Sequence, residues 1–226
     1  MRGELVALDL ETTGLDVNND SIIEIGAVRI RDGKILEEYS TLVNPGFVIP
    51  NETTHITGIH QEDLRNAPLL TDALPEITEF VGNSPVIAHN VSFDIGFMRR
   101  FGTMKSNLPI DTFELASILL PRVPRYSLSS LAKLLEIDLE NAHRALDDAR
   151  ATAILYWHLW EKITALPPAI VFEITRAMQN ITWETGEVFR AAYEEIKTDG
   201  DVDEIQSVST VFAPLDSNTQ PLKAND

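Results

Sequence analysis

The chain has 226 residues, of which 44% are hydrophobic and 23% are charged, a composition typical of globular proteins that excludes a wholly disordered chain or a coiled coil. At roughly 150 residues per domain, this length allows one sizeable domain with an appendage. The 35 acidic and 18 basic residues give a net charge of −17, which argues against passive nucleic-acid binding because phosphate contacts need Lys and Arg.

The absence of cysteine and the hydropathy of the sequence exclude several further classes of protein. The sequence contains no cysteine, which excludes disulfide scaffolds, thiolate zinc sites and cysteine nucleophiles. No stretch approaches the roughly 18 apolar residues of a membrane span, and no signal peptide is recognisable. We therefore expect a cytoplasmic protein that contacts no membrane.

Hydrophobic periodicity predicts a sheet first, then alternating strands and helices, and finally helices alone. The polar turn at residues 31–34 contains Gly33 and predicts a hairpin. Residues 44–68 are expected to form an irregular loop. Ser127 and Asn141 are candidate helix caps. The predicted strands are residues 4–10, 22–31, 35–43, 85–88 and 109–111, and the predicted helices are residues 70–81, 92–101, 112–120, 127–135, 142–163, 169–179 and 182–197.

Two carboxylates stand at the end of the first predicted strand. Asp9 and Glu11 are two residues apart, so their side chains point to the same face of a strand. The carboxyl ends of strands are where α/β sheets place their sites. An isolated pair of this kind is equally typical of a strand that ends in a polar turn.

Two further groups of polar residues open predicted helices. His89, Asn90 and Asp94 follow the fourth predicted strand, and His143 precedes the adjacent acids Asp147 and Asp148. Each acid alone could be a first-turn residue favoured by the helix dipole.

Together and in this order, the three segments resemble the DnaQ-like (DEDDh) family of 3′→5′ exonucleases. The family patterns are D-x-E-T, H-N-x-x-F-D and H-x-A-x-x-D. They are filled by Asp9, Glu11 and Thr12, by His89, Asn90, Phe93 and Asp94, and by His143, Ala145 and Asp148. The resemblance covers residues 4–164. It implies an α/β, RNase H-like fold with a mixed five-stranded central sheet flanked by helices.

Elementary electrostatics requires a cofactor for this set. Carboxylates gathered around one point repel by about 3 kcal/mol per pair at about 5 Å and an effective dielectric of about 20. Oxygen ligands without cysteine favour Mg²⁺ or Mn²⁺, and two such ions are the usual arrangement for phosphodiester hydrolysis. Bound dications would also attract the substrate phosphate despite the negative net charge.

The resemblance implies a role for each residue. Asp9, Glu11, Asp94 and Asp148 hold two metal ions, while His143 acts as the general base toward the attacking water, because the unperturbed pKa of histidine lies near neutrality. Spacing alone leaves Asp147 and Asp148 open as the fourth ligand; the family pattern favours Asp148 if His143 lies on a loop or in the first turn. The implied substrate-binding residues are Thr12, His55, His89, Asn90 and Phe93.

The expected domains are an exonuclease domain at residues 1–165, a helical extension at 166–198 and an acidic flexible tail at 199–226. The extension resembles the segment that follows the exonuclease domain in DinG-type helicases, although the chain has no phosphate-binding loop. The expected activity is removal of 5′-mononucleotides from the 3′ end of single-stranded DNA. The context is either a helicase domain or a DNA polymerase III epsilon-like proofreading subunit. The alternatives are an exoribonuclease of the same fold and a non-catalytic nucleic-acid-binding or scaffold relative.

Overall fold

The computed structural model describes residues 1–139 and 142–199 and contains one five-stranded sheet in the order β3-β2-β1-β4-β5. Strands β1, β2 and β3 are antiparallel neighbours, whereas β4 and β5 run parallel to β1. The mixed five-stranded sheet expected from the sequence is therefore confirmed. The strands are β1 (Glu4–Thr12), β2 (Ile22–Arg31), β3 (Lys34–Leu42), β4 (Val86–Ala88) and β5 (Pro109–Asp111).

The β2–β3 connection is the hairpin that the sequence predicts. Arg31 pairs with Lys34, and the two residues between them, Asp32 and Gly33, have φ angles of 49° and 75°. Positive φ at both positions is the requirement of a type I′ turn, which Asp-Gly satisfies readily.

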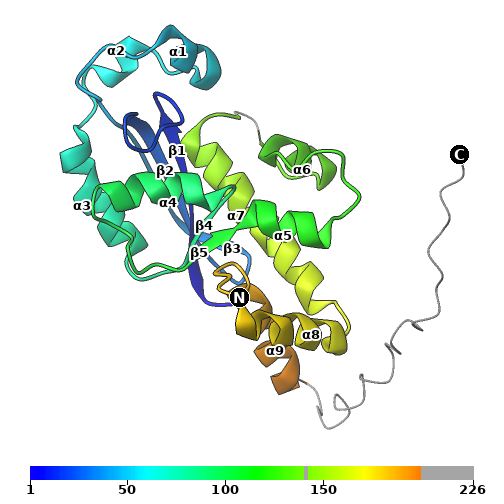
Figure 1. Cartoon of the computed structure of the whole chain (residues 1–226). Helices are drawn as coiled ribbons and strands as arrows, with labels where there is room; N and C mark the ends of the chain where they lie inside the picture. Colours follow the sequence, from blue (N-terminus) through cyan, green and yellow to red (C-terminus); the bar gives the residue numbers. More distant parts are fainter. Residues whose placement is uncertain (140–141, 200–226) are drawn as a thin grey trace, which may run out of the picture.

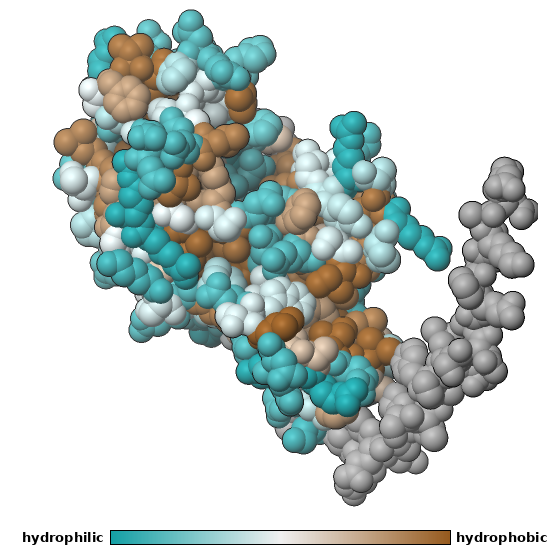
Figure 2. Space-filling view, in the orientation of Figure 1, coloured by the Kyte–Doolittle hydropathy of each residue, from teal (hydrophilic) through white to brown (hydrophobic). Residues whose placement is uncertain are grey.

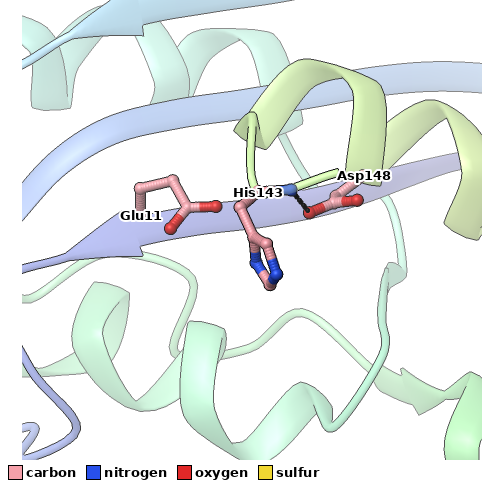
Figure 3. A group of neighbouring side chains, drawn as sticks. All are labelled: Glu11, His143 and Asp148. Carbon is pink, nitrogen blue, oxygen red and sulfur yellow. Dashed lines mark hydrogen bonds between the residues drawn. The ribbon is translucent and has the colours of Figure 1, made fainter. Parts of the chain in front are cut away.

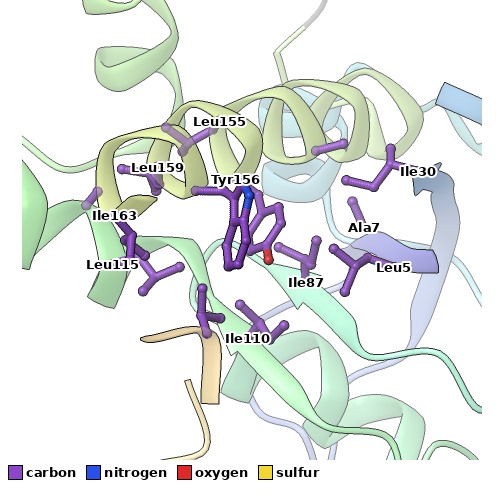
Figure 4. Packing of buried hydrophobic residues seen from close by; sticks show 14 of the residues in the cluster. Leu5, Ala7, Ile30, Ile87, Ile110, Leu115, Leu155, Tyr156, Leu159 and Ile163 are labelled. Carbon is purple, nitrogen blue, oxygen red and sulfur yellow. The ribbon is translucent and has the colours of Figure 1, made fainter. Parts of the chain in front are cut away.

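Helices cover both faces of the sheet (Figure 1). On one face, α7 (Ala145–Thr164) packs against Leu5 and Ala7 of β1, and buried Tyr156 and Leu159 lie in this cluster (Figure 4). On the other face, α3 (Leu70–Val81) and α4 (Val91–Arg100) contribute to a second cluster with the alternate residues of β1. After β5 the chain forms α5 (Thr112–Leu119) and α6 (Leu128–Leu134), the latter capped by Ser127 as predicted.

The loop predicted for residues 44–68 is wrong in part. This segment contains two short helices, α1 (Asn51–Thr57) and α2 (Gln61–Leu64), separated by Gly58 with φ of 70°. Neither is long enough to show a helical apolar repeat, so a short helix of this kind leaves little periodic signal.

The long helix begins later than predicted. The sequence suggests a start at residue 142, but α7 begins at Ala145, because His143 has φ of 68° and Arg144 is extended. The predicted cap Asn141 lies outside the described residues. The chain then forms α8 (Pro168–Ala177), the 3₁₀ turn η1 (Met178–Asn180) and α9 (Glu187–Asp199), so the second predicted extension helix also starts late, at Glu187 and not at residue 182.

Two expectations concern the remaining chain. The acidic tail predicted for residues 199–226 lies outside the described residues, apart from Asp199 at the end of α9. Within residues 1–139 and 142–199, no helix combines the length and apolar character that a bilayer crossing requires.

Candidate active site

Asp9 and Glu11 lie on the α7 side of β1. They continue the odd-numbered row of Leu5 and Ala7, which packs beneath α7, because side chains two apart on a strand share a face. The row therefore changes from apolar to acidic where β1 passes the first turn of α7. Glu11 is 9% exposed.

Asp94 reaches the same place from α4. This helix begins after Asn90, which has φ of 73°, and the Asp111 carboxylate accepts hydrogen bonds from the backbone N of Asn90 and of Val91, both at 3.1 Å. Asp94 is 4% exposed, and its Oδ1 accepts a hydrogen bond from the backbone N of Leu10 at 3.0 Å. This bond attaches the first turn of α4 to the end of β1.

His143 and Asp148 come from the start of α7 (Figure 3). Asp148 is buried, whereas His143 is exposed and lies outside the helix. One oxygen of Glu11, one ring nitrogen of His143 and one oxygen of Asp148 all lie within 4.8 Å of one another. Asp147, the alternative that spacing left open, instead accepts a hydrogen bond from Arg150 Nη1 at 2.7 Å and does not line the cleft described next.

These side chains line one cleft of about 590 Å³. The sequence-predicted residues that line it are Asp9, Glu11, Thr12, His89, Phe93, Asp94, His143 and Asp148. All four predicted carboxylates and the predicted base therefore share one cleft, although they come from β1, α4 and the start of α7. A cavity of this size lies in the range of small-ligand sites.

The carboxylates strongly perturb one another. Burial, followed by the charges of Asp94 and Asp148, raises the pKa of Asp9 well above its usual range. Burial also raises the pKa values of Asp94 and Asp148. For Glu11, burial and then the neighbouring Asp148 raise the pKa to about 8. Burial and like charge both disfavour ionisation of these acids, and a cation bound among them would favour it.

This donor set fits divalent cations. The residues offer carboxylate oxygens and one imidazole nitrogen, and hard oxygen donors suit Mg²⁺ or Mn²⁺. A bound dication would favour the ionised carboxylates and remove the repulsion that raises their pKa values. The residues that could hold it are Asp9, Glu11, Asp94 and Asp148, with His143 close enough to compete as a ligand.

The predicted substrate-binding residues differ in their surroundings. His89 lines the cleft, but its Nε2 donates a hydrogen bond to the Tyr126 carbonyl at 2.6 Å and its Nδ1 lies 2.9 Å from Thr112 Oγ1. Burial lowers the pKa of His89, which favours the neutral ring. Both ring nitrogens already have hydrogen-bond partners within the protein. Thr12 Oγ1 donates to the Gly14 carbonyl at 2.6 Å.

Phe93 packs edge-on against Phe97, with ring centroids 5.1 Å apart, and also lines the cleft. His55 and Asn90 are exposed and do not line it. The α1 residues that line the cleft are Glu52, Thr53, Ile56 and Thr57, and not His55.

The cleft also has an apolar rim, which the sequence motifs do not indicate. Leu15 is 85% exposed and Ile56 is 51% exposed, and both line the cleft. Figure 2 shows apolar surface in the region of α1 and α2. An apolar residue directly after the Asp9–Gly14 segment is the signal that could have indicated Leu15, whereas Ile56 required knowledge that residues 51–57 are helical.

Comparison with known proteins identifies the family of this chain. A family model described as exonuclease matches residues 6–156, a span that contains all four carboxylates and His143. The chain belongs to the exonuclease family. The resemblance to DnaQ-like exonucleases is thereby confirmed.

Individual relatives agree with this membership. The chain is 46% identical over 154 residues to a DNA polymerase III PolC-type from Clostridium perfringens, covering 66% of this chain and 11% of that protein. It thus spans about a tenth of the length of the PolC-type relatives. It is 37% identical over 166 residues to a DNA polymerase III subunit epsilon from Aquifex aeolicus, covering 71% of this chain and 82% of that protein.

Among solved structures, exonuclease X in complex with 5′ overhanging duplex DNA matches with a TM-score of 0.60 and 31% identity, covering 70% of this chain and 91% of that chain. The DinG-type helicase context stays a prediction.

Proposed function

We propose that this chain is a metal-dependent 3′→5′ exonuclease that removes mononucleotides from the 3′ end of single-stranded DNA. The observation that carries the proposal is the gathering of Asp9, Glu11, Asp94, Asp148 and His143 around one cleft. A binding or scaffolding relative has no need of four mutually repelling acids together with a histidine. The four acids would hold two Mg²⁺ or Mn²⁺ ions, which when bound supply Lewis-acid activation of water and charge stabilisation at phosphorus.

The other side chains of the cleft have separate proposed roles in proton transfer and base contact. His143, exposed at the mouth of the acidic cluster, accepts a proton from the attacking water as a general base. The leaving group is the 3′ oxygen of the next nucleotide, and the product is a 5′-mononucleotide. Exposed Leu15 and Ile56 at the rim suit contact with the apolar faces of the terminal bases.

The test is a digestion assay with 5′-labelled single-stranded DNA, duplex DNA and RNA, each with Mg²⁺, with Mn²⁺ and with excess chelator. We expect stepwise shortening of single-stranded DNA that stops in chelator and resumes when either ion is restored. Undiminished cleavage in chelator would overturn the mechanism. Faster degradation of RNA than of DNA would move the substrate class to the exoribonuclease alternative.

The cellular context that we propose is a replicative polymerase. Support comes from the likeness to a PolC-type polymerase and to an epsilon subunit; the competing proposal is linkage to a DinG-type helicase. A binding assay of this chain with the replicative polymerase and with the helicase of the same organism separates the two. Selective binding to the helicase would reject the polymerase context without affecting the exonuclease proposal.

A further inference from the structure

The backbone at His143 is held in an uncommon conformation. Its φ of 68° lies in the left-handed region, which disfavours residues other than glycine unless the surroundings impose it. The side chain is exposed, so packing around the imidazole does not fix its place. The described hydrogen bond of the His143 backbone joins it to Asp148 at the start of α7.

Glu24 of β2 contacts the start of α7. Its side chain is only 2% exposed, and both of its oxygens accept hydrogen bonds from the α7 terminus. Arg144 Nε donates to Oε1 and Oε2 at 3.2 Å each, and Arg144 Nη2 donates to Oε1 at 2.8 Å. The backbone N of Ala145 donates to Oε2 at 3.0 Å. A forked arginine–carboxylate pair fixes orientation as well as distance.

Gly26 allows the α7 terminus to approach the sheet this closely. It lies two residues after Glu24 and therefore on the same face of β2. A Cβ at Gly26 would lie 2.2 Å from the carbonyl carbon of Ala145 and 2.3 Å from the backbone N of Leu146. These are backbone atoms that cannot rotate away, so the first turn of α7 rests directly on the main chain of β2.

The sheet register places this contact beside the acidic cluster. Glu24 is the cross-strand partner of Glu11, and Gly26 is the partner of Asp9. Directly opposed residues of an antiparallel pair share a face. The two acids of β1 and the two residues of β2 that contact α7, Glu24 and Gly26, therefore lie side by side on the same face of the sheet.

Arg144 also connects Glu24 to Asp148. Its carbonyl oxygen accepts a hydrogen bond from the backbone N of Asp148 at 3.0 Å, while Asp148 Oδ2 accepts one from the backbone N of His143 at 3.0 Å. A shift of Arg144 would therefore move both His143 and Asp148.

We infer that Glu24 is a positioning residue: by holding Arg144 and Ala145 over Gly26, it fixes His143 and Asp148 against Glu11. The inference rests on the proposed function, in which His143 is the base. The Arg144 side chain is 49% exposed, so water can solvate its charge without Glu24, and the pair is better explained by the position that it gives the start of α7 than by stability.

The test compares Glu24→Gln with Glu38→Gln. Glu38 of β3 receives the same kind of forked pair from α7, with Arg150 Nε and Nη2 each 2.7 Å from its oxygens. Arg150 also bonds to Asp147, which does not line the cleft. We expect Glu24→Gln to lower kcat by about 100-fold, the usual cost of misplacing a catalytic group by about 1 Å, with KM and Tm close to wild type. Glu38→Gln should leave kcat unchanged.

A second readout needs neither metal nor substrate. The ring Cε1–H resonance of His143, identified by its loss in His143→Ala, should shift in metal-free Glu24→Gln and stay at its wild-type position in Glu38→Gln. If the wild-type chain degrades no nucleic acid, the proposed function fails, and this resonance alone decides whether Glu24 holds His143.

A double variant tests whether Glu24 acts through His143. Glu24→Gln should cost less in a His143→Ala background than in the wild type, because only the effect that runs through Asp148 remains there. If Glu24→Gln does not fold, Arg144→Lys replaces it, because lysine keeps the charge but loses the fork. An unchanged resonance, an unchanged kcat, or the same loss of kcat with and without His143 would each overturn the inference.

Discussion

The backbone N of His143 donates a hydrogen bond to Asp148 Oδ2 at 3.0 Å, across a separation of five residues. This bond spans the start of α7, where His143 lies outside the helix and Asp148 lies in its first turn. One interaction therefore sets the distance between the proposed base and a proposed metal ligand. It also explains how a five-residue offset brings the two side chains to one cleft.

The two adjacent acids should differ sharply in function. Asp148 lines the cleft, whereas Asp147 forms an ion pair with Arg150. We expect Asp148→Asn to abolish turnover and Asp147→Asn to retain most of it, measured as kcat on the same single-stranded DNA. The opposite ranking would show that Asp147 is the ligand.

His143→Ala should lower kcat by roughly 10² to 10⁴, the usual contribution of a positioned general base. Calorimetric titration with Mn²⁺ should give an affinity close to wild type. Because His143 lies within 4.8 Å of oxygens of Glu11 and Asp148, the informative alternative is a collapse of Mn²⁺ affinity. That result would make His143 a metal ligand and leave the base to be found elsewhere.

The metal-free protein should lose stability as the pH rises. A carboxyl with a higher pKa in the folded state stabilises the fold fully below its unfolded pKa, and this contribution is lost as the pH rises through the folded value. For Glu11 that window runs from 4.5 to about 8. We expect Tm in chelator to fall across this window, and Mg²⁺ or Mn²⁺ to raise Tm most at its upper end.

Glu11→Gln is the matched control for this pH dependence. The variant removes the titrating group but keeps the shape of the side chain, so its Tm should depend less on pH than that of the wild type over the same window. Equal slopes for the two proteins would refute the assignment of the effect to Glu11.

His89 should contribute more to stability than to nucleotide binding. Its two ring nitrogens contact the Tyr126 carbonyl and Thr112 Oγ1, and each hydrogen bond is worth about 1 kcal/mol net. His89→Ala should therefore have a clearly lower Tm than the wild type, whereas its KM for DNA should differ little from the wild-type value. A raised KM at unchanged Tm would restore the substrate-binding role that the family pattern implies.

The strands and the site motifs could be predicted because their signals are local. Residues 22–31 and 109–111 form strands with the predicted bounds, since each is a short run of residues suited to a sheet between turn residues. Asp9 and Glu11 share a face by the two-residue period alone. The order and spacing of the three family motifs then indicate that Asp9 and Glu11 lie close to Asp94 and Asp148.

The start of α7 could not be predicted in the same way. A helical pattern extends back to residue 142, but Glu24, 120 residues earlier, holds Arg144 in extended geometry. Such a contact leaves one trace in the sequence, an acid within the otherwise apolar strand of residues 22–28. The short helix α1 was likewise missed, and with it the face that presents Ile56 rather than His55 to the cleft.

In the proposed function, the cleft hydrolyses the terminal phosphodiester at a 3′ end. The most direct measurement follows single-stranded DNA labelled in its last nucleotide, in linear form with a free 3′ hydroxyl and as a closed circle, both in Mg²⁺. We expect the label to leave the linear strand first, as a 5′-mononucleotide, while the circle persists. Nicking of the circle at a comparable rate, or release of the label within longer oligonucleotides, would contradict it.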